Sequence, residues 1–146
     1  MDAYSKKILG WCVAPTLEAS YSINALKMAI KTLPEGFSET LVHHSDRGTQ
    51  YASADYIKVL AASNITPSMT ESGNPKDNAM AERINSTVKN ELLHGKAFHS
   101  LRQVIEAVRK AVDFYNNERP HSSIDWHTPE ETSRSEERFS RNAETD

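Results

Sequence analysis

Apolar and polar positions follow two different periods along the first half of the chain. Short apolar runs bounded by turn residues are typical of buried strands, and they occur over residues 7–14, 39–44 and 64–69. Between these runs the apolar residues recur at i, i+3, i+4 and i+7, which predicts helices over residues 17–33 and 53–63. Strands that alternate with helices in this way predict an α/β domain.

The second half of the chain is predicted to be helical. A helix is expected over residues 78–94, capped by Asp77 or Asn78, with these residues on its buried side: Met80, Ile84, Val88 and Leu92. Ser100-x-x-Gln103 has the form of a capping box and opens a second helix with a long apolar stripe: Leu101, Val104, Ile105, Val108, Val112 and Tyr115.

Three further segments have distinct expectations. Thr16 and Ser53 are placed to cap the two earlier helices. The polar stretch 70–77 is expected to be a loop that is mobile without ligand. Residues 1–131 are predicted to form the domain, whereas residues 132–146 are charge-rich without apolar spacing and are predicted to be a disordered tail.

Length and composition limit the choice of class. A chain of 146 residues with 38% hydrophobic and 25% charged residues suits one soluble domain. No apolar run approaches the roughly 20 residues of a membrane span, and the N-terminus lacks the apolar segment of a signal peptide, so a cytoplasmic location is expected. The one cysteine, Cys12, lies in an apolar run and is expected to be a small buried residue rather than a nucleophile.

Net charge varies along the chain. The total of −3 argues against a DNA partner, but it divides into −2 over residues 1–82, +3 over residues 83–121 and −4 over residues 122–146. The positive segment begins directly after Glu82. This asymmetry fits a basic surface for nucleic acid, although ordinary surface variation would also produce it.

Two carboxylates stand in settings that favour chemistry. Asp46 directly follows the apolar run that ends a predicted strand, and Glu82 lies early in a predicted helix, with 35 residues between the two acids. Ligands of open α/β sheets gather at the carboxyl ends of strands. The spacing alone defines no site, since acids are common and mostly solvated.

Several multi-residue motifs in this sequence resemble those of the Asp-Asp-Glu transposases of insertion sequences, whose catalytic domain is similar to retroviral integrase. They are His44-Ser45-Asp46-Arg47-Gly48-x-Gln50-Tyr51, Ser68-Met69-x-x-x-Gly73-Asn74-Pro75-x-Asp77-Asn78-Ala79-x-x-Glu82, Lys89-x-Glu91 and Tyr115-Asn116-x-x-Arg119-Pro120-His121. They occur in the family's order, and the resemblance as a whole extends from Met1 to about Glu131.

The resemblance implies a ribonuclease-H-like fold with strand order 3-2-1-4-5, in which Asp46 matches the second catalytic acid and Glu82 the third. The first acid has no counterpart here, so the chain is expected to lack the first strand and most of the second. Asp2 matches a hairpin-turn position, where local backbone hydrogen bonds are the ordinary role of aspartate. The chain is therefore expected to be inactive alone, and its exposed strand edges favour self-association.

The implied chemistry is DNA strand cleavage and strand transfer with two Mg²⁺ or Mn²⁺ ions. Asp46 and Glu82 would supply the oxygen ligands that such cations prefer, and Lys89 would hold a phosphate. Glu82, Asn85, Ser86 and Lys89 recur at i, i+3, i+4 and i+7 on one polar helix face. Asn85, Ser86 and Lys89 on this face, with Asn78 and Arg119, are the predicted DNA contacts, although Arg119 would equally be a solvated turn residue.

Other interpretations compete with this one. A zinc site at His43 and His44 is disfavoured because neighbouring strand residues point to opposite faces. Ser45, His44 and Asp46 are consecutive and cannot form a hydrolase triad. A non-catalytic DNA-binding or protein-interaction module derived from a transposase remains the alternative function.

Overall fold

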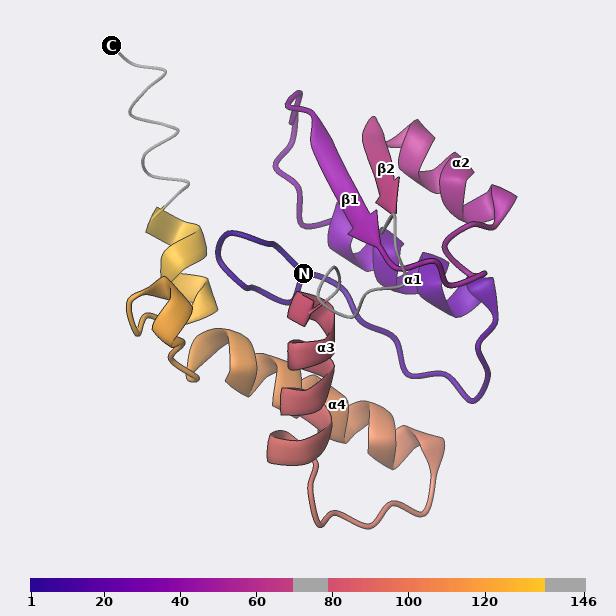
Figure 1. Cartoon of the computed structure of the whole chain (residues 1–146). Helices are drawn as coiled ribbons and strands as arrows, with labels where there is room; N and C mark the ends of the chain where they lie inside the picture. Colours follow the sequence, from indigo (N-terminus) through magenta and orange to yellow (C-terminus); the bar gives the residue numbers. More distant parts are fainter. Residues whose placement is uncertain (70–78, 136–146) are drawn as a thin grey trace. The chain divides into compact units, whose positions relative to one another are not determined.

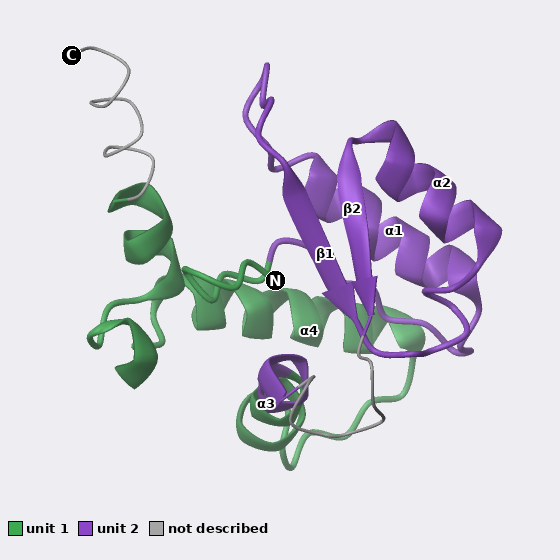
Figure 2. Cartoon of the chain, turned by 45° about the horizontal axis from the view of Figure 1, so that its top comes forward, with its two compact units in different colours: residues 1–8, 85–146 green, residues 9–84 purple. Residues whose placement is uncertain are grey.

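The computed structural model describes residues 1–69 and 79–135 (Figure 1). The chain divides into two compact units: unit 1 comprises residues 1–8 and 85–146, and unit 2 comprises residues 9–84 (Figure 2). The two described strands both belong to unit 2. Each unit has its own internal hydrogen bonds and packing.

Unit 2 is built on two parallel strands joined by a helix. β1 (Leu41–Ser45) pairs with β2 (Ile65–Met69) in a register that places Leu41 opposite Ile65 and Ser45 opposite Met69. The connection is α2 (Ala54–Ala62), as parallel neighbours require a crossover. Ser53 caps α2 because its hydroxyl accepts the Tyr56 N–H at 3.3 Å. Both strands therefore end at the same edge of the sheet.

The core of unit 2 lies between this sheet and its helices. The buried residues are Leu26 on α1 (Ala19–Ile30), Tyr56 and Leu60 on α2, and Ile65 on β2. The chain also crosses α1 closely at Gly10, where a Cβ would lie 2.0 Å from the Ala25 carbonyl oxygen. A side chain there would force the backbones apart, so this glycine permits the packing of residues 9–11 on α1.

Unit 1 is organised by α4 (Leu101–Asn117). The predicted capping box is present: the Ser100 hydroxyl accepts the Gln103 N–H, and the Gln103 side chain accepts the His99 N–H. Near its other end Asn116 is buried, and its amide holds the backbone of Ile8 from both sides. The Ile8 N–H donates to Asn116 Oδ1 at 2.9 Å, and Asn116 Nδ2 donates to the Ile8 carbonyl at 3.0 Å. One side chain thus replaces a strand partner.

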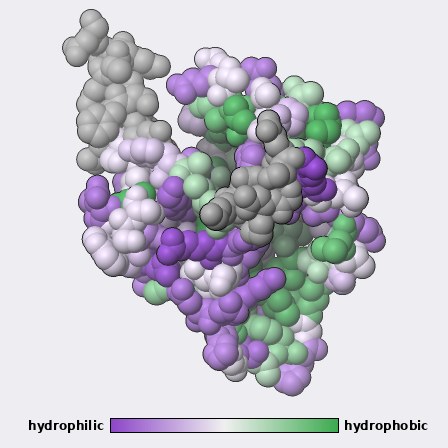
Figure 3. Space-filling model, viewed as in Figure 1, coloured by the Kyte–Doolittle hydropathy of each residue, from purple (hydrophilic) through white to green (hydrophobic). Residues whose placement is uncertain are grey.

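The apolar stripe of α4 is buried only along its second half. Ala111, Val112 and Tyr115 are buried, whereas Leu101 and Ile105 are 49% and 40% exposed. The surface over the first half of α4 is accordingly apolar in Figure 3. The predicted helix is therefore confirmed, but the prediction that its whole apolar stripe is packed is wrong for the first turns.

Several sequence predictions differ from the structure in unit 2. The strands at 39–44 and 64–69 are confirmed as β1 and β2, but residues 7–14 form no strand because no neighbouring strand pairs with them in the described chain. Cys12, predicted to be buried, is exposed. The helix predicted over 17–33 is shorter, and its N-cap is Glu18 rather than Thr16.

The helix predicted over 78–94 is confirmed with an unpredicted change of pitch. α3 (Ala79–Ser86) is followed by the π-helix η2 (Thr87–Leu92). Met80, expected on the buried side, is 41% exposed, and Thr87 is buried instead. A π-turn carries more residues per turn than an α-turn, so the apolar spacing read at 3.6 residues fails there. The predicted cap and the whole of the 70–77 loop lie outside the described residues.

The described part of the chain ends in a further helix over residues 129–135, which includes the first four residues of the predicted tail. Thr128 and Glu131 form its capping box, with the Thr128 N–H donating to Glu131 Oε2 at 2.8 Å. Among the described residues, no helix combines the length and apolarity that a membrane crossing needs.

Replacing Asn116 with Ala should destabilise unit 1. The change leaves the Ile8 N–H and C=O without their partners, and each such group costs about 1–3 kcal/mol, so a loss of roughly 2–4 kcal/mol is expected. Urea unfolding and hydrogen exchange at the Ile8 amide would measure it. The matched control is Asn117→Ala, which removes one exposed hydrogen bond to the Asp113 carbonyl. Equal effects of the two variants would contradict this account.

Candidate active site and nucleic-acid interface

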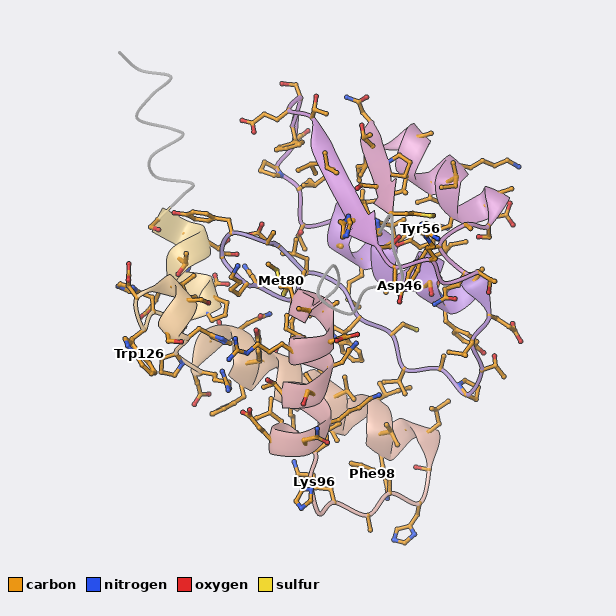
Figure 4. The ribbon with its side chains drawn as sticks, in the orientation of Figure 1. Asp46, Tyr56, Met80, Lys96, Phe98 and Trp126 are labelled. Carbon is orange, nitrogen blue, oxygen red and sulfur yellow. The ribbon has the colours of Figure 1, made fainter. Side chains whose placement is uncertain are left out.

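Asp46 lies immediately after β1, at the carboxyl end of the parallel sheet (Figure 4). Its side chain is half-buried and is oriented by the turn that follows: the Gly48 N–H donates to Asp46 Oδ1 at 2.8 Å. A Cβ on Gly48 would lie 2.9 Å from that oxygen, closer than side chains approach without moving. Glycine at this position therefore lets the backbone fix the carboxylate.

The loop that carries Asp46 is closed by successive hydrogen bonds. The Tyr51 N–H donates to the Gly48 carbonyl at 3.0 Å, and the Ser53 hydroxyl donates to the Gln50 carbonyl at 3.0 Å. Ser53 in turn caps α2. The segment from Asp46 to the first turn of α2 is thus held by its own hydrogen bonds, without regular secondary structure.

Three rings lie at the base of this loop. Tyr56, from α2, has its hydroxyl 3.0 Å from His43 Nε2. The Tyr56 ring meets those of His43 and Tyr51 edge to face, with centroids 5.5 and 5.4 Å apart. His43 precedes Asp46 on β1, and Tyr51 ends the loop. The cluster therefore ties the strand, the loop and the helix together.

The protonation states of this cluster follow from its burial. Burial, with a smaller contribution from Tyr51, raises the pKa of Tyr56 to about 12, so the phenol keeps its proton. Burial also lowers the pKa of His43, so its imidazole is neutral at neutral pH. A neutral imidazole has one N–H donor and one acceptor nitrogen, and the Tyr56 hydroxyl, 3.0 Å from His43 Nε2, forms a hydrogen bond with this ring.

Glu82 lies in the first turn of α3 and is exposed. It belongs to the same compact unit as Asp46, but residues 70–78, which connect β2 to α3, lie outside the described chain. The described residues include no group of three or more metal-ligating side chains. The pairing of Asp46 with Glu82 stays a prediction.

Asp2 has the role of a turn residue in unit 1. Its carboxylate accepts the Ser5 N–H at 2.8 Å and also the Ser5 hydroxyl, and its own N–H donates to the Lys7 carbonyl. Burial opposes ionisation of Asp2, but the hydrogen bonds from Ser5 and Tyr4 outweigh it and lower the pKa of the carboxyl. These contacts match the interpretation of Asp2 as a hairpin residue.

The two histidines before Asp46 face different partners. His43 meets Tyr56, whereas His44 Nδ1 lies 3.0 Å from the Ser68 hydroxyl on β2. The alternation expected of neighbouring strand residues is present, and it separates the two imidazoles. This arrangement agrees with the reasoning against a shared zinc ion.

The predicted DNA contacts divide into two groups. Asn85 and Ser86 on α3 and Lys89 on η2 are exposed. Ser86 also accepts a hydrogen bond from Asn90 Nδ2 at 3.0 Å. Because η2 is π-helical, the 3.6-residue period that placed Lys89 on the face of Asn85 and Ser86 does not hold beyond Ser86.

Arg119 has a structural partner. Its Nη2 and Nε donate to Glu91 Oε2 at 2.8 and 3.2 Å, and its Nη1 lies 3.4 Å from His121 Nδ1. The Arg119 side chain is 27% exposed. Because Glu91 lies on η2 and Arg119 directly follows α4, this ion pair joins η2 to the end of α4. The sequence left open whether Arg119 contacts DNA or solvent, and this ion pair was not foreseen. Asn78, the remaining predicted contact, lies outside the described residues.

Sequence reasoning missed the His43, Tyr51 and Tyr56 cluster as a part of the site. The sequence places Tyr56 within the predicted helix over residues 53–63 and Tyr51 within the motif that contains Asp46, and neither placement indicates a contact with His43. A signal was present, since both tyrosines bracket the cap that follows Asp46. Their contacts nevertheless depend on the fold of β1 against α2.

Parallel strands joined by a helix, with a carboxylate at the carboxyl edge, define an α/β domain. The comparisons with known proteins agree. Two models described as "Integrase core domain" match residues 1–75 and 63–129. The chain belongs to the integrase core family of insertion-sequence transposases.

One curated relative is a "Putative transposase for insertion sequence element IS986/IS6110" of Mycobacterium tuberculosis (strain ATCC 25177 / H37Ra), which is 41% identical over 122 residues. The match covers 81% of this chain and 44% of the relative. The chain thus spans less than half the length of this relative.

Solved structures of integrases share the fold. The catalytic core of BIV integrase has a TM-score of 0.63 at 23% identity, covering 87% of this chain and 78% of that one. The HTLV-2 integrase catalytic core, solved in complex with magnesium, has a TM-score of 0.57 at 20% identity, covering 79% and 69% of the two chains. The ribonuclease-H-like α/β fold predicted from the sequence is supported, although the described residues contain only two of its strands.

The stability of unit 2 should fall on acidification through His43. Its folded pKa lies below the unfolded value of about 6.5, so the unfolded chain binds the proton more readily, and the free energy of unfolding decreases from about pH 6.5 down to the folded pKa. Thermal melting between about pH 7.5 and about pH 5 would measure this slope. His43→Gln should flatten it and His44→Gln should not. An unchanged slope in His43→Gln would refute the assignment.

Proposed function

We propose that this chain is a transposase catalytic core that serves metal-dependent DNA strand cleavage and strand transfer, with Asp46 and Glu82 as catalytic ligands. The observation that supports this most is the setting of Asp46: a half-buried carboxylate directly after a parallel strand, oriented by the Gly48 N–H. Substrates of α/β sheets bind at this edge.

The donor chemistry of the site fits Mg²⁺ or Mn²⁺. Asp46 and Glu82 offer oxygen ligands, which hard cations prefer. Such cations activate an attacking oxygen and stabilise a departing one when two are bound. The HTLV-2 integrase core was solved with magnesium, which supports the same cation here.

The chain's own residues would divide the work. Asp46 and Glu82 would bind the cations, and the closed Asp46 loop would hold the first carboxylate in one orientation. Lys89 would attract a DNA phosphate as a point charge, with Asn85, Ser86 and Asn78 nearby in sequence as polar contacts. Within these 146 residues the family's first acid has no match, so the isolated chain is expected to bind a cation without cleaving DNA.

A double variant tests the metal ligands. Asp46→Asn with Glu82→Gln should weaken Mn²⁺ binding by more than about tenfold, because even residues behind metal ligands change affinity by about 10–100-fold. Calorimetric titration of the purified chain measures it. Asp55→Asn with Glu35→Gln removes two exposed acids and should leave the affinity unchanged. Equal affinity in all three proteins would refute the proposed ligands.

A non-catalytic DNA-binding module is the second candidate. The exposed Asn85, Ser86 and Lys89 in the positive segment support it, because they need no metal to contact DNA. Affinity for transposon-end DNA separates the two functions. If the double variant binds DNA as the unchanged chain does, and neither protein responds to Mg²⁺, the non-catalytic function holds.

Self-association is the partner proposal. β1 pairs only with β2 among the described strands, and Val42 on β1 is 64% exposed. An open strand edge with apolar side chains favours pairing with another chain, whereas Pro67 weakens the hydrogen-bonding capacity of β2. Sedimentation velocity over a range of protein concentrations should show rising mass, and Val42→Lys should reduce it. A constant monomer mass would overturn the proposal.

A further inference from the structure

A continuous chain of hydrogen bonds leads from Asp46 through the loop and α2 back to β1. From Asp46 the hydrogen bonds run through Gly48 to Tyr51 and, by way of the Gln50 carbonyl and the Ser53 hydroxyl, into the first turn of α2. Tyr56 then returns to β1 through its hydroxyl, 3.0 Å from His43 Nε2. Backbone alone separates His43 from Asp46. The other hydrogen bonds join residues close together in the sequence. Only the bond between Tyr56 and His43 links α2 directly back to β1 among these contacts.

We propose that His43 and Tyr56 are positioning residues whose hydrogen bond holds the Asp46 loop, so that the Asp46 carboxylate keeps one orientation toward a divalent cation. The proposal rests on the proposed function of Asp46 and deepens it. Neither His43 nor Tyr56 would touch the cation. They act through the loop that they close, together with the packing of Tyr51 against both rings.

Burial makes this bond effective. Tyr56 is 3% exposed, and it lies in the core cluster with Leu60 and Ile65. A hydroxyl in such a place costs free energy unless it is paired, so the phenol and the imidazole are strongly held to each other. α2 is packed in the core through Tyr56 and Leu60. The hydrogen bond between Tyr56 and His43 therefore restrains the end of β1, which Asp46 follows.

The geometry of the loop has a direct reporter. The Gly48 N–H donates to Asp46 Oδ1, so its hydrogen exchange and its NMR chemical shift follow the orientation of the carboxylate. This readout needs neither metal nor DNA. A side chain that merely fills the core would alter the melting temperature without acting on this one amide.

The experiment compares variants of the 146-residue chain. In Tyr56→Phe the ring stays and the donor is lost, so the Gly48 amide should exchange about fivefold faster or more, since one net hydrogen bond corresponds to a factor of that order. Mn²⁺ affinity should fall by about tenfold, as it does for residues that orient metal ligands. His43→Leu should behave in the same way, and His43→Gln, which keeps an acceptor, should restore both values.

Two controls separate positioning from stability. Tyr21→Phe removes the hydroxyl of a half-buried tyrosine on α1 in the same unit and should leave the Gly48 amide unchanged. Ile57→Val removes a methylene beside Tyr56, so it should lower the melting temperature and leave Gly48 exchange unchanged. If Ile57→Val accelerates Gly48 exchange as much as Tyr56→Phe does, the pair is only part of the core and the proposal fails.

The outcomes distinguish this proposal from the function on which it rests. If the unchanged chain binds no Mn²⁺ while Tyr56→Phe and His43→Leu still loosen the Gly48 amide, the loop-holding role stands and the metal role of Asp46 falls. If Asp46→Asn abolishes Mn²⁺ binding while Tyr56→Phe matches the unchanged chain in both readouts, the metal role stands and the positioning role is overturned. Should Tyr56→Phe fail to fold, the contrast between His43→Leu and His43→Gln decides the matter.

Discussion

Parallel pairing of β1 with β2 is the constraint from which the candidate site follows. Parallel neighbours need a crossover, and α2 supplies it, so the chain must leave β1 at the same edge at which β2 ends. The loop between β1 and α2 therefore begins at a sheet edge with a packed helix directly behind it. Asp46 is the first residue of that loop, and its place at the carboxyl end of the sheet is a consequence of topology.

In unit 1 a side chain, rather than a neighbouring strand, satisfies the backbone hydrogen-bonding groups of one residue, Ile8. The Ile8 backbone has one donor and one acceptor to satisfy, and the buried amide of Asn116 meets both. The same stretch of sequence supplies Arg119, which pairs with Glu91, and His121, which packs edge to face on Tyr115 at 4.7 Å. The Tyr115-Asn116-x-x-Arg119-Pro120-His121 motif is thus a set of structural contacts that joins residues 1–8, η2 and the end of α4.

Local signals in the sequence were reliable where the chemistry itself is local. Ser53 and Ser100 cap their helices as predicted, since a cap needs only its own next three residues. The strands ending near His44 and Met69 were also found from short apolar runs. The strand at 7–14 failed because a strand requires a partner that the run itself does not specify, and the burial of Thr87 was missed because this residue lies in η2, where the helical period changes.

The sequence by itself determined that the chain is an α/β domain of integrase type and that Asp46 follows a strand, since apolar period, caps and motifs are properties of neighbouring residues. Tertiary structure decided which side chains support that aspartate. His43 and Tyr56 meet only when α2 packs on the sheet, and Asn116 reaches Ile8 across more than a hundred residues of chain. Such contacts depend on the packing of distant segments, because burial and hydrogen-bond geometry are set by the folded chain and carry no fixed spacing in the sequence.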